Sequence, residues 1–278
     1  MAADADLLRR LVDALEGLGA PSPEADRRLD ARFHRFDPRN GRFAPAPGGA
    51  LPLDLLIGID RQKAAVLTLV GRFADGVSTN HALLWGARGT GKSSLVKAAV
   101  EAVGAEQPRL KLVEIAAEDL ARLPDLFAAV QDRPERVVLL CDDLSFEEGA
   151  AGAKALKSIL EGGVSGPPEN VLIVATSNRR HLMPREHEAG EDALAAAEDA
   201  EESLSMSDRF GLWLGFPPMD QRGFLAAVRA YAERFGLETP DLDRRALQWA
   251  QRRGARSGRV AVQFIRDLAG ELGRPRPC

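Results

Sequence analysis

A glycine-rich segment at residues 86–93 carries side chains that could bind phosphate. It reads Gly-Ala-Arg-Gly-Thr-Gly-Lys-Ser and fits the spacing G-x-x-x-x-G-K-[ST]. Its glycines let backbone N–H groups curl around phosphate oxygens, Lys92 can neutralise the outer phosphates, and the Ser93 hydroxyl can ligate a magnesium ion. We therefore predict a nucleotide-binding loop. The residues expected to contact the nucleotide are Gly86, Ala87, Arg88, Gly89, Thr90, Gly91, Lys92, Ser93 and Ser94.

A pair of carboxylates follows an apolar run at residues 137–141. Magnesium bound to a triphosphate prefers carboxylate oxygen, so Asp142 is predicted to hold the metal, directly or through water. Asp143 is then the candidate that orients or deprotonates the attacking water, although its side chain is one carbon shorter than that of a glutamate. Glu147 and Glu148 are alternative bases.

Asn178 follows the next apolar run, at residues 171–176. In a parallel sheet the ends of adjacent strands meet at one edge, so Asn178 can lie beside the phosphate. It could then donate a hydrogen bond to the terminal phosphoryl oxygen or position the water. Taken alone, an asparagine here would more simply cap a turn before Arg179 and Arg180. The two preceding motifs favour the role in phosphate chemistry.

The elements that must position these side chains are short apolar runs that alternate with helix-length segments. The expected strands cover residues 81–85, 110–115, 137–141 and 171–176. Such alternation predicts an α/β fold with a parallel sheet flanked by helices. From about Pro218 onward the strand signals stop, and helical periods follow over residues 224–235 and 260–268. A small helical lid is therefore expected to close the chain.

The segments outside this core have different patterns. Apolar residues recur at helical spacing over residues 7–18 and predict an amphipathic helix, whereas the stretch 21–52, rich in Pro, Gly and Arg, predicts an extended arm. Nine acidic side chains and a single arginine between residues 184 and 208 predict a solvated acidic insertion. The predicted organisation is an N-terminal helix and arm at 1–52, a core at 53–217 that contains the insertion, and the lid at 218–278.

Composition narrows the classes of partner. The 278 residues are 45% hydrophobic and 28% charged, as in ordinary globular proteins, and the net charge of -4 gives no overall polycation for nucleic acid. Any such partner must use a local patch, for which the arginine-rich lid is the candidate. Two cysteines cannot make a disulfide framework. No run approaches the roughly 18 apolar residues of a membrane span, and the first residues do not resemble a signal peptide. We expect a cytoplasmic protein with no membrane partner.

Together these motifs resemble those of the AAA+ ATPases. The stretch 53–60, which reads LDLLIGID, is similar to the segment that lines the adenine pocket in that superfamily, chiefly through Ile57 and Gly58. Asn178 matches the sensor-one position. The resemblance implies a P-loop NTPase core with a helical lid, and it implies ATP and Mg²⁺ as ligands.

Two arginines match further positions of the superfamily. Arg209, in the segment SDRF, resembles the arginine finger that reaches the terminal phosphate bound by a neighbouring subunit, which implies a homo-oligomer. Arg259, in the segment SGRV, matches the sensor-two position in the lid, with Arg256 as a weaker candidate.

More narrowly, the chain resembles a bacterial family of AAA-type ATP-binding proteins known as a domain of unknown function. The resemblance covers about residues 53–268 and rests on the segments LLWGARGTGKSSLVKA, LLCDDLSFEEG, VLIVATSNRRHLMP and SDRFGLWLGF. It implies fold and ATP use without implying a cellular task.

Three functions remain open from the sequence. The first is a slow or partner-stimulated, Mg²⁺-dependent ATPase that acts as a switch on, or remodeller of, a protein partner. The second is a nucleic-acid-associated ATPase, because paired aspartates also occur in replication initiators and helicase loaders. The third is a nucleotide-dependent scaffold without catalysis. A processive translocase is disfavoured, because residues 116–120 lack an aromatic-apolar-glycine loop and the connection at 161–170 is too short for a DNA-gripping hairpin.

Overall fold

The computed structural model of the chain describes residues 29–46, 49–144, 151–161, 166–178 and 209–275, without the side chains of residues 151–154. Several sequence predictions lie outside the described residues. These are the amphipathic helix at 7–18, the acidic insertion at 184–208, and the alternative bases Glu147 and Glu148.

A seven-stranded sheet forms the centre of the molecule, in the order β2-β1-β4-β5-β6-β3-β7. Every neighbouring pair is parallel except β1 with β2. The strands are β1 (Phe33–Asp37), β2 (Arg42–Pro45), β3 (Ala82–Gly86), β4 (Leu110–Ile115), β5 (Arg136–Cys141), β6 (Val171–Ser177) and β7 (Leu212–Phe216). The four predicted strands are confirmed as β3 to β6. Their parallel order brings the carboxyl ends of β3, β5 and β6 to one edge.

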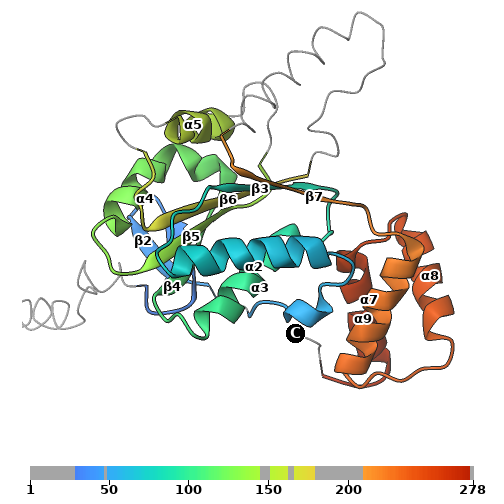
Figure 1. Cartoon of the computed structure of the whole chain (residues 1–278). Coiled ribbons are helices and arrows are strands. Elements are labelled where there is room, and N and C mark those ends of the chain that lie inside the picture. Colours follow the sequence, from blue (N-terminus) through green and yellow to red (C-terminus); the bar gives the residue numbers. More distant parts are fainter. Residues whose placement is uncertain (1–28, 47–48, 145–150, 162–165, 179–208, 276–278) are drawn as a thin grey trace, which may run out of the picture.

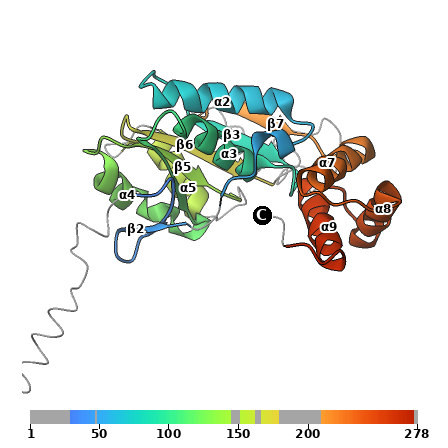
Figure 2. The same ribbon diagram turned by 90° about the horizontal axis from the view of Figure 1, so that it is seen from below.

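Helices cover both faces of this sheet (Figures 1 and 2). On one face lie α2 (Asp60–Ala74) and α3 (Lys92–Gly104). The opposite face is covered by η3 (Ala117–Arg122), α4 (Leu123–Val130) and α5 (Ala151–Leu160). Side chains alternate between the two apolar cores along each central strand, and all seven residues of β6 are buried. The near-continuous apolar runs of the sequence follow from burial on both faces.

The prediction of an extended arm is wrong for residues 33–45, which form the strands β1 and β2 and the turn between them. β1 pairs in parallel with β4, and β2 returns antiparallel to β1. Phe33 enters the core under α2 and α3, whereas Phe36 and Phe43 enter the opposite core with their ring centroids 5.5 Å apart. The isolated phenylalanines are therefore sheet residues. Strands of four and five residues are too short to give a sustained period of their own.

A three-helix lid follows β7, as predicted for the chain beyond Pro218. It consists of α7 (Gln221–Arg234), α8 (Leu242–Arg253) and α9 (Gly258–Glu271), and it has its own apolar core. The Asp220 carboxylate accepts from the Gly223 N–H at 2.7 Å and caps α7, and Ser257 caps α9 in the same way through Val260. The short helix η2 (Leu53–Leu55) precedes α2 of the sheet domain but contributes Leu55 to the lid core, and it so connects the sheet domain with the lid. Among the described helices, none is both long and apolar enough to cross a membrane.

Candidate functional site

The glycine-rich loop joins the end of β3 to the start of α3, as its motif requires. Gly86 and Gly89 adopt positive φ angles of 138° and 75°. A Cβ atom at Gly86 would lie 2.2 Å from the Phe216 carbonyl oxygen, and one at Gly89 would lie 2.8 Å from the Ser257 Oγ of the lid. Glycine is therefore required here both for the backbone conformation and for the close approach of β7 and α9.

Lys92 projects from the first residue of α3 back into the loop and is 5% exposed. Its Nζ donates to the carbonyl oxygens of Gly86 at 2.8 Å and Ala87 at 2.9 Å, and to the Asn178 Oδ1 at 2.9 Å. Burial lowers the pKa of Lys92 from its ordinary value, while the nearby carboxylates of Asp142 and Asp143 act in the opposite direction. The ammonium group thus lies beside the backbone that would surround a phosphate chain.

Asp142, at the end of β5, is held by two hydroxyl groups. The Ser93 Oγ and the Thr176 Oγ1 both donate to the Asp142 Oδ1, the latter at 2.6 Å. These hard oxygen donors suit Mg²⁺, which proteins bind through one or two carboxylates together with substrate phosphates. No group of three or more His, Cys, Asp or Glu side chains with metal-site geometry exists in the described parts of the chain. A magnesium ion here would complete its ligand shell with phosphate oxygens and water, and it would offset their charge.

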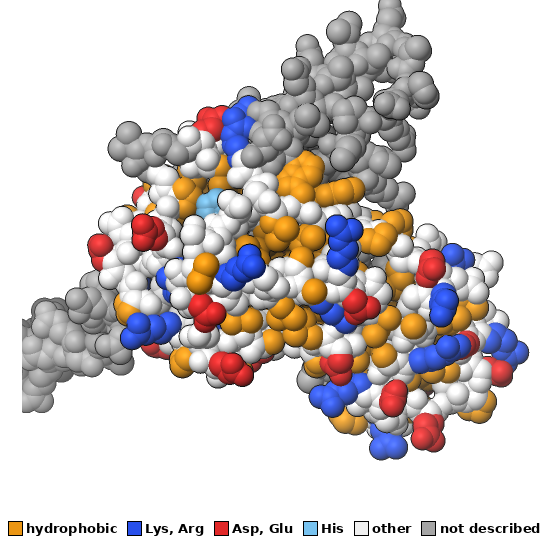
Figure 3. Space-filling view, in the orientation of Figure 1, with side chains coloured by type: hydrophobic (Ala, Val, Ile, Leu, Met, Phe, Trp, Pro, Cys, Tyr) orange, Lys and Arg blue, Asp and Glu red, His pale blue; other side chains and the backbone are white. Residues whose placement is uncertain are grey.

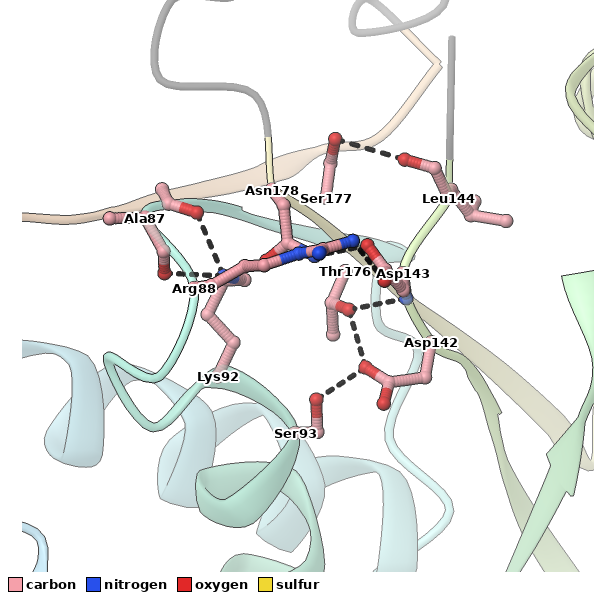
Figure 4. A network of polar contacts seen from close by, with 11 residues as sticks. Ala87, Arg88, Lys92, Ser93, Asp142, Asp143, Leu144, Thr176, Ser177 and Asn178 are labelled. Carbon is pink, nitrogen blue, oxygen red and sulfur yellow. Dashed lines mark hydrogen bonds and ion pairs between the residues drawn. The ribbon is translucent and has the colours of Figure 1, made fainter. Parts of the chain in front are cut away.

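Asp143 adopts a left-handed backbone conformation, with φ at 57°. Its N–H donates to the Thr176 Oγ1 at 2.9 Å, and its carboxylate accepts from the Asn178 side-chain amide and, at 3.2 Å, from the Arg88 guanidinium. Figure 4 shows these groups converging at the ends of β5 and β6. Asn178 therefore contacts both the phosphate-loop lysine and the candidate base, through the two atoms of one amide.

A cavity of about 530 Å³ opens between this network and the lid. The sequence-predicted residues that line it are Arg88, Gly89, Gly91, Lys92, Ser93, Ser94, Asp142, Asp143, Asn178 and Arg259. The N-terminus of α9 closes it, because the Gly258 N–H donates to the Gly89 carbonyl at 2.9 Å. Residues from positions 88 to 259 of the chain, which include the predicted phosphate, metal and sensor-two positions, thus meet at one cavity, whereas Gly86, Ala87 and Thr90 do not line it.

Three polar residues of this site, Thr176, Gln263 and Arg266, are not indicated by the sequence motifs. Thr176 is 1% exposed and orders both aspartates, but a threonine within a buried strand gives no signal of its own. Arg266 lines the cavity with Arg259. Their spacing of seven residues places both arginines on one face of α9, so this spacing could have indicated Arg266 as a second site residue. The cavity then holds the four cationic side chains Arg88, Lys92, Arg259 and Arg266 against two aspartates, a balance that suits an anionic ligand.

Ile57 and Gly58 lie beside the loop but outside the lining of this cavity. They line a neighbouring cavity of about 450 Å³ together with Thr90 and the residues that lead into α7. The lining of the first cavity instead includes Leu51, Leu56 and Tyr231 as its larger apolar side chains.

Arg209 lies at the end of the sheet opposite to the phosphate-binding loop. It precedes β7, which runs parallel to β3, so it lies near the amino end of β3 and far from the loop at its carboxyl end. Its guanidinium forms an ion pair with Glu161, directly after α5. Arg209 therefore does not line the cavity of its own chain. Arg256 is exposed and does not line the cavity either.

Two solved structures show the same fold at low sequence identity. ORC1 of Aeropyrum pernix, solved in complex with DNA, aligns with a TM-score of 0.55 and 17% identity over 83% of this chain and 64% of that chain. The AAA domain of FIGL-1, solved in complex with ADP, aligns with a TM-score of 0.50 and 18% identity over 82% of this chain and 76% of that chain. The chain spans less than two thirds of the ORC1 chain. The likeness establishes the AAA+ P-loop fold.

No curated protein sequence matches the chain. The family model described as "Protein of unknown function (DUF815)" matches residues 30–272, which include both strands of the corrected arm, the core and the lid. The chain therefore belongs to the DUF815 family and has the fold of an AAA+ P-loop ATPase.

Proposed function

We propose that this protein binds and hydrolyses ATP in the presence of Mg²⁺ and uses the reaction as a switch on a protein partner. An AAA+ fold implies a nucleotide-dependent function in general. The specific observation in favour of hydrolysis is the amide of Asn178, which contacts Lys92 and Asp143 at once. A protein that only bound nucleotide would need the metal-holding Asp142 but not a second carboxylate, Asp143, ordered beside the phosphate site.

In this proposal the loop and α9 hold the triphosphate. The N–H groups of residues 86–94 and the positive end of α3 face the phosphates, Lys92 and Arg259 offset their charge, and Ser93 and Asp142 hold the metal. Ile57 and Gly58 contact the adenine in the neighbouring cavity.

Hydrolysis requires a positioned water. Its oxygen forms a bond to the γ-phosphorus, and the bond from that phosphorus to the oxygen bridging to the β-phosphate breaks. Asp143 accepts the proton of the water, directly or after the bond has formed, and Asn178 orients the water or the γ-phosphoryl oxygen. The products are ADP and inorganic phosphate.

Arg209 acts on the site of a neighbouring copy. A strand of five residues spans about 13 Å at ~3.3 Å per residue, so the length of β7 separates Arg209 from the loop of its own chain. An arginine near a subunit edge can still supply charge to the terminal phosphate in trans. The proposal therefore includes a homo-oligomer.

The surface of the lid favours a protein partner over nucleic acid as the client. Arg229, Arg244 and Arg245 form ion pairs with Asp243, Asp241 and Glu271, respectively. On the face in Figure 3, positive and negative side chains are interspersed over the lid. Such a surface has little of the one-sign field that attracts a phosphate backbone.

A nucleic-acid-associated function is the second candidate, and one cluster favours it. Arg252, Arg253 and Arg256 are all exposed at the end of α8 and in the turn that leads to α9. Fluorescence anisotropy with labelled double-stranded DNA tests this candidate. Contacts to phosphates predict affinity that falls steeply as salt rises, and Arg252→Gln/Arg253→Gln should reduce that slope. Absence of binding at low salt would eliminate it.

Phosphate release from ATP by the wild type, with and without Mg²⁺, tests the proposed hydrolysis. Asn178→Ala should reduce turnover by about 100-fold, the usual effect of one hydrogen-bond donor to a developing charge. Asn40→Ala, in the exposed β1–β2 turn, is the matched control and should have no effect. Nucleotide binding with no Mg²⁺-dependent release by the wild type would favour the non-catalytic scaffold.

A further inference from the structure

Arg88 reaches across the mouth of the phosphate loop to Asp143. The loop follows β3 and Asp143 follows β5, and the sheet places β6 between these two strands. The contact therefore spans two strand spacings, about 10 Å, which only a long side chain can bridge. Figure 4 shows the Arg88 side chain extending past Lys92 and Asn178 to the Asp143 carboxylate.

In the proposed function the terminal phosphate binds between Lys92 and Asp143, in the cavity that Arg88 also lines. Lys92, which would neutralise the outer phosphates, donates to the Asn178 amide, and the same amide donates to Asp143, which would hold the attacking water. Besides burial, which is the main cause, the charges of Arg259 and Arg88 lower the pKa of Lys92. Hydrogen bonds also link the two cations, because Arg88 contacts Asp143, Asp143 accepts from the Asn178 amide, and the same amide accepts from Lys92.

The ion pair between Arg88 and Asp143 is weak, so another anion can replace Asp143 as the partner of Arg88. The side chains are 71% and 52% exposed, and a single contact at 3.2 Å joins them. Exposed, singly bonded ion pairs contribute little to stability, whereas an arginine bound to phosphate by two parallel hydrogen bonds is among the strongest charge-assisted contacts. A γ-phosphate can therefore displace Asp143 from Arg88 at small cost.

We propose that Arg88 discriminates triphosphate from diphosphate by exchanging its partner from the Asp143 carboxylate to the γ-phosphate. This inference rests on the proposed function, because it uses the same nucleotide site. With ATP bound, Arg88 contacts the γ-phosphate and Asp143 becomes available to the water. With ADP bound, nothing extends beyond Lys92, so Arg88 returns to Asp143 and neutralises it. Arg88 is in this way a positioning residue for the base as well as a specificity residue.

Isothermal titration calorimetry with Mg²⁺ and either AMP-PNP or ADP tests this exchange. Arg88→Gln should weaken AMP-PNP binding about tenfold and change ADP binding less than about twofold. Arg88→Lys keeps the charge and should restore part of the preference for AMP-PNP. Arg122→Gln removes another exposed arginine that pairs with one aspartate, Asp125, and should change neither affinity.

A double-mutant cycle separates partner exchange from general electrostatics. Asp143→Asn should tighten AMP-PNP binding several-fold in the wild-type background, because it removes the competitor for Arg88, and it should do so much less in Arg88→Gln. Equal tightening in both backgrounds would overturn the proposal, as would equal loss of AMP-PNP and ADP affinity in Arg88→Gln. Failure of the wild type to bind either nucleotide would instead overturn the proposed function.

Discussion

The Thr176 hydroxyl donates a hydrogen bond to the Asp142 carboxylate at 2.6 Å and also accepts one from the Asp143 N–H at 2.9 Å. One buried side chain of β6 therefore orients both aspartates at the end of β5. The Leu144 N–H, which donates to the Thr176 carbonyl at 2.8 Å, continues the same attachment of the two strand ends.

Replacing Thr176 should therefore impair the site without removing any predicted ligand. Thr176→Val keeps the shape but leaves the Asp143 N–H without this acceptor, at a cost of about 1–3 kcal/mol in the free energy of unfolding. We expect phosphate release to fall at least tenfold, while Thr176→Ser keeps the hydroxyl and stays near the wild type. Urea denaturation and a phosphate-release assay measure the two effects. Equal rates in the valine and serine variants would show that the hydroxyl does not position the carboxylates.

Arg209→Ala should lower turnover by about 10³ or more, the range of arginine fingers, and leave ATP affinity unchanged. Asp143→Asn is the complementary defect, with an intact Arg209 and an inactive site. Mixing the two variants should restore part of the activity, because Arg209 of one copy can reach the competent site of the other. Turnover that mixing does not restore, or that is independent of protein concentration in the wild type, would contradict the role in trans.

The contact between the loop and the lid should be sensitive to Gly89. A Cβ there would lie 2.8 Å from the Ser257 Oγ and 3.2 Å from the Arg259 Cβ, so Gly89→Ala must push α9 away. Gly254 has a similar φ of 64° with open space around it, and Gly254→Ala provides a control for backbone strain alone, about 1–2 kcal/mol. Only Gly89→Ala should also weaken nucleotide binding, which titration calorimetry measures. The same loss of affinity in both variants would rule out the lid contact as the cause.

His81 should make the fold sensitive to acid. Burial lowers its pKa to about 4, and its Nδ1 accepts the Ile173 N–H at 3.2 Å, so the folded protein keeps the imidazole neutral. The unfolded chain has a pKa near 6.5 and binds the proton first. Stability is thus complete above about pH 6.5 and falls as the pH drops toward 4, by on the order of 3 kcal/mol.

His81→Asn keeps an acceptor for Ile173 and removes the titration. Its free energy of unfolding, measured by urea denaturation across this range, should depend less on pH than that of the wild type. The same pH dependence in both proteins would assign the effect to other groups.

The central part of the site could be predicted because the sequence motifs lie at the ends of strands, and the parallel topology brings those ends together. Each of the segments at 86–93, 142–143 and 178 directly follows a buried strand, and parallel strands bring their carboxyl ends to one edge. Whatever depends on strand order or register could not be predicted. Thr176 reaches Asp142 only because Cys141 pairs with Ala175, and Arg88 crosses to Asp143 only because β6 lies between β3 and β5.

Three strands near the two edges of the sheet, β1, β2 and β7, were missed for a different reason. Each has exposed or half-buried residues, so its apolar run is interrupted, whereas the equally short β3 is buried over four of its five residues. Pairing of β1 with β4, of β2 with β1 and of β7 with β3 supplies the stabilisation that their own sequences do not reveal.

Single-turnover hydrolysis by Asp143→Asn tests the proposed ATPase mechanism most directly. Loss of a general base predicts a rate of phosphate formation from bound ATP that is at least about 100-fold below the wild type. Calorimetry with AMP-PNP should at the same time show affinity several-fold tighter than that of the wild type. Hydrolysis at the wild-type rate by this variant would contradict the assignment of Asp143 as the base.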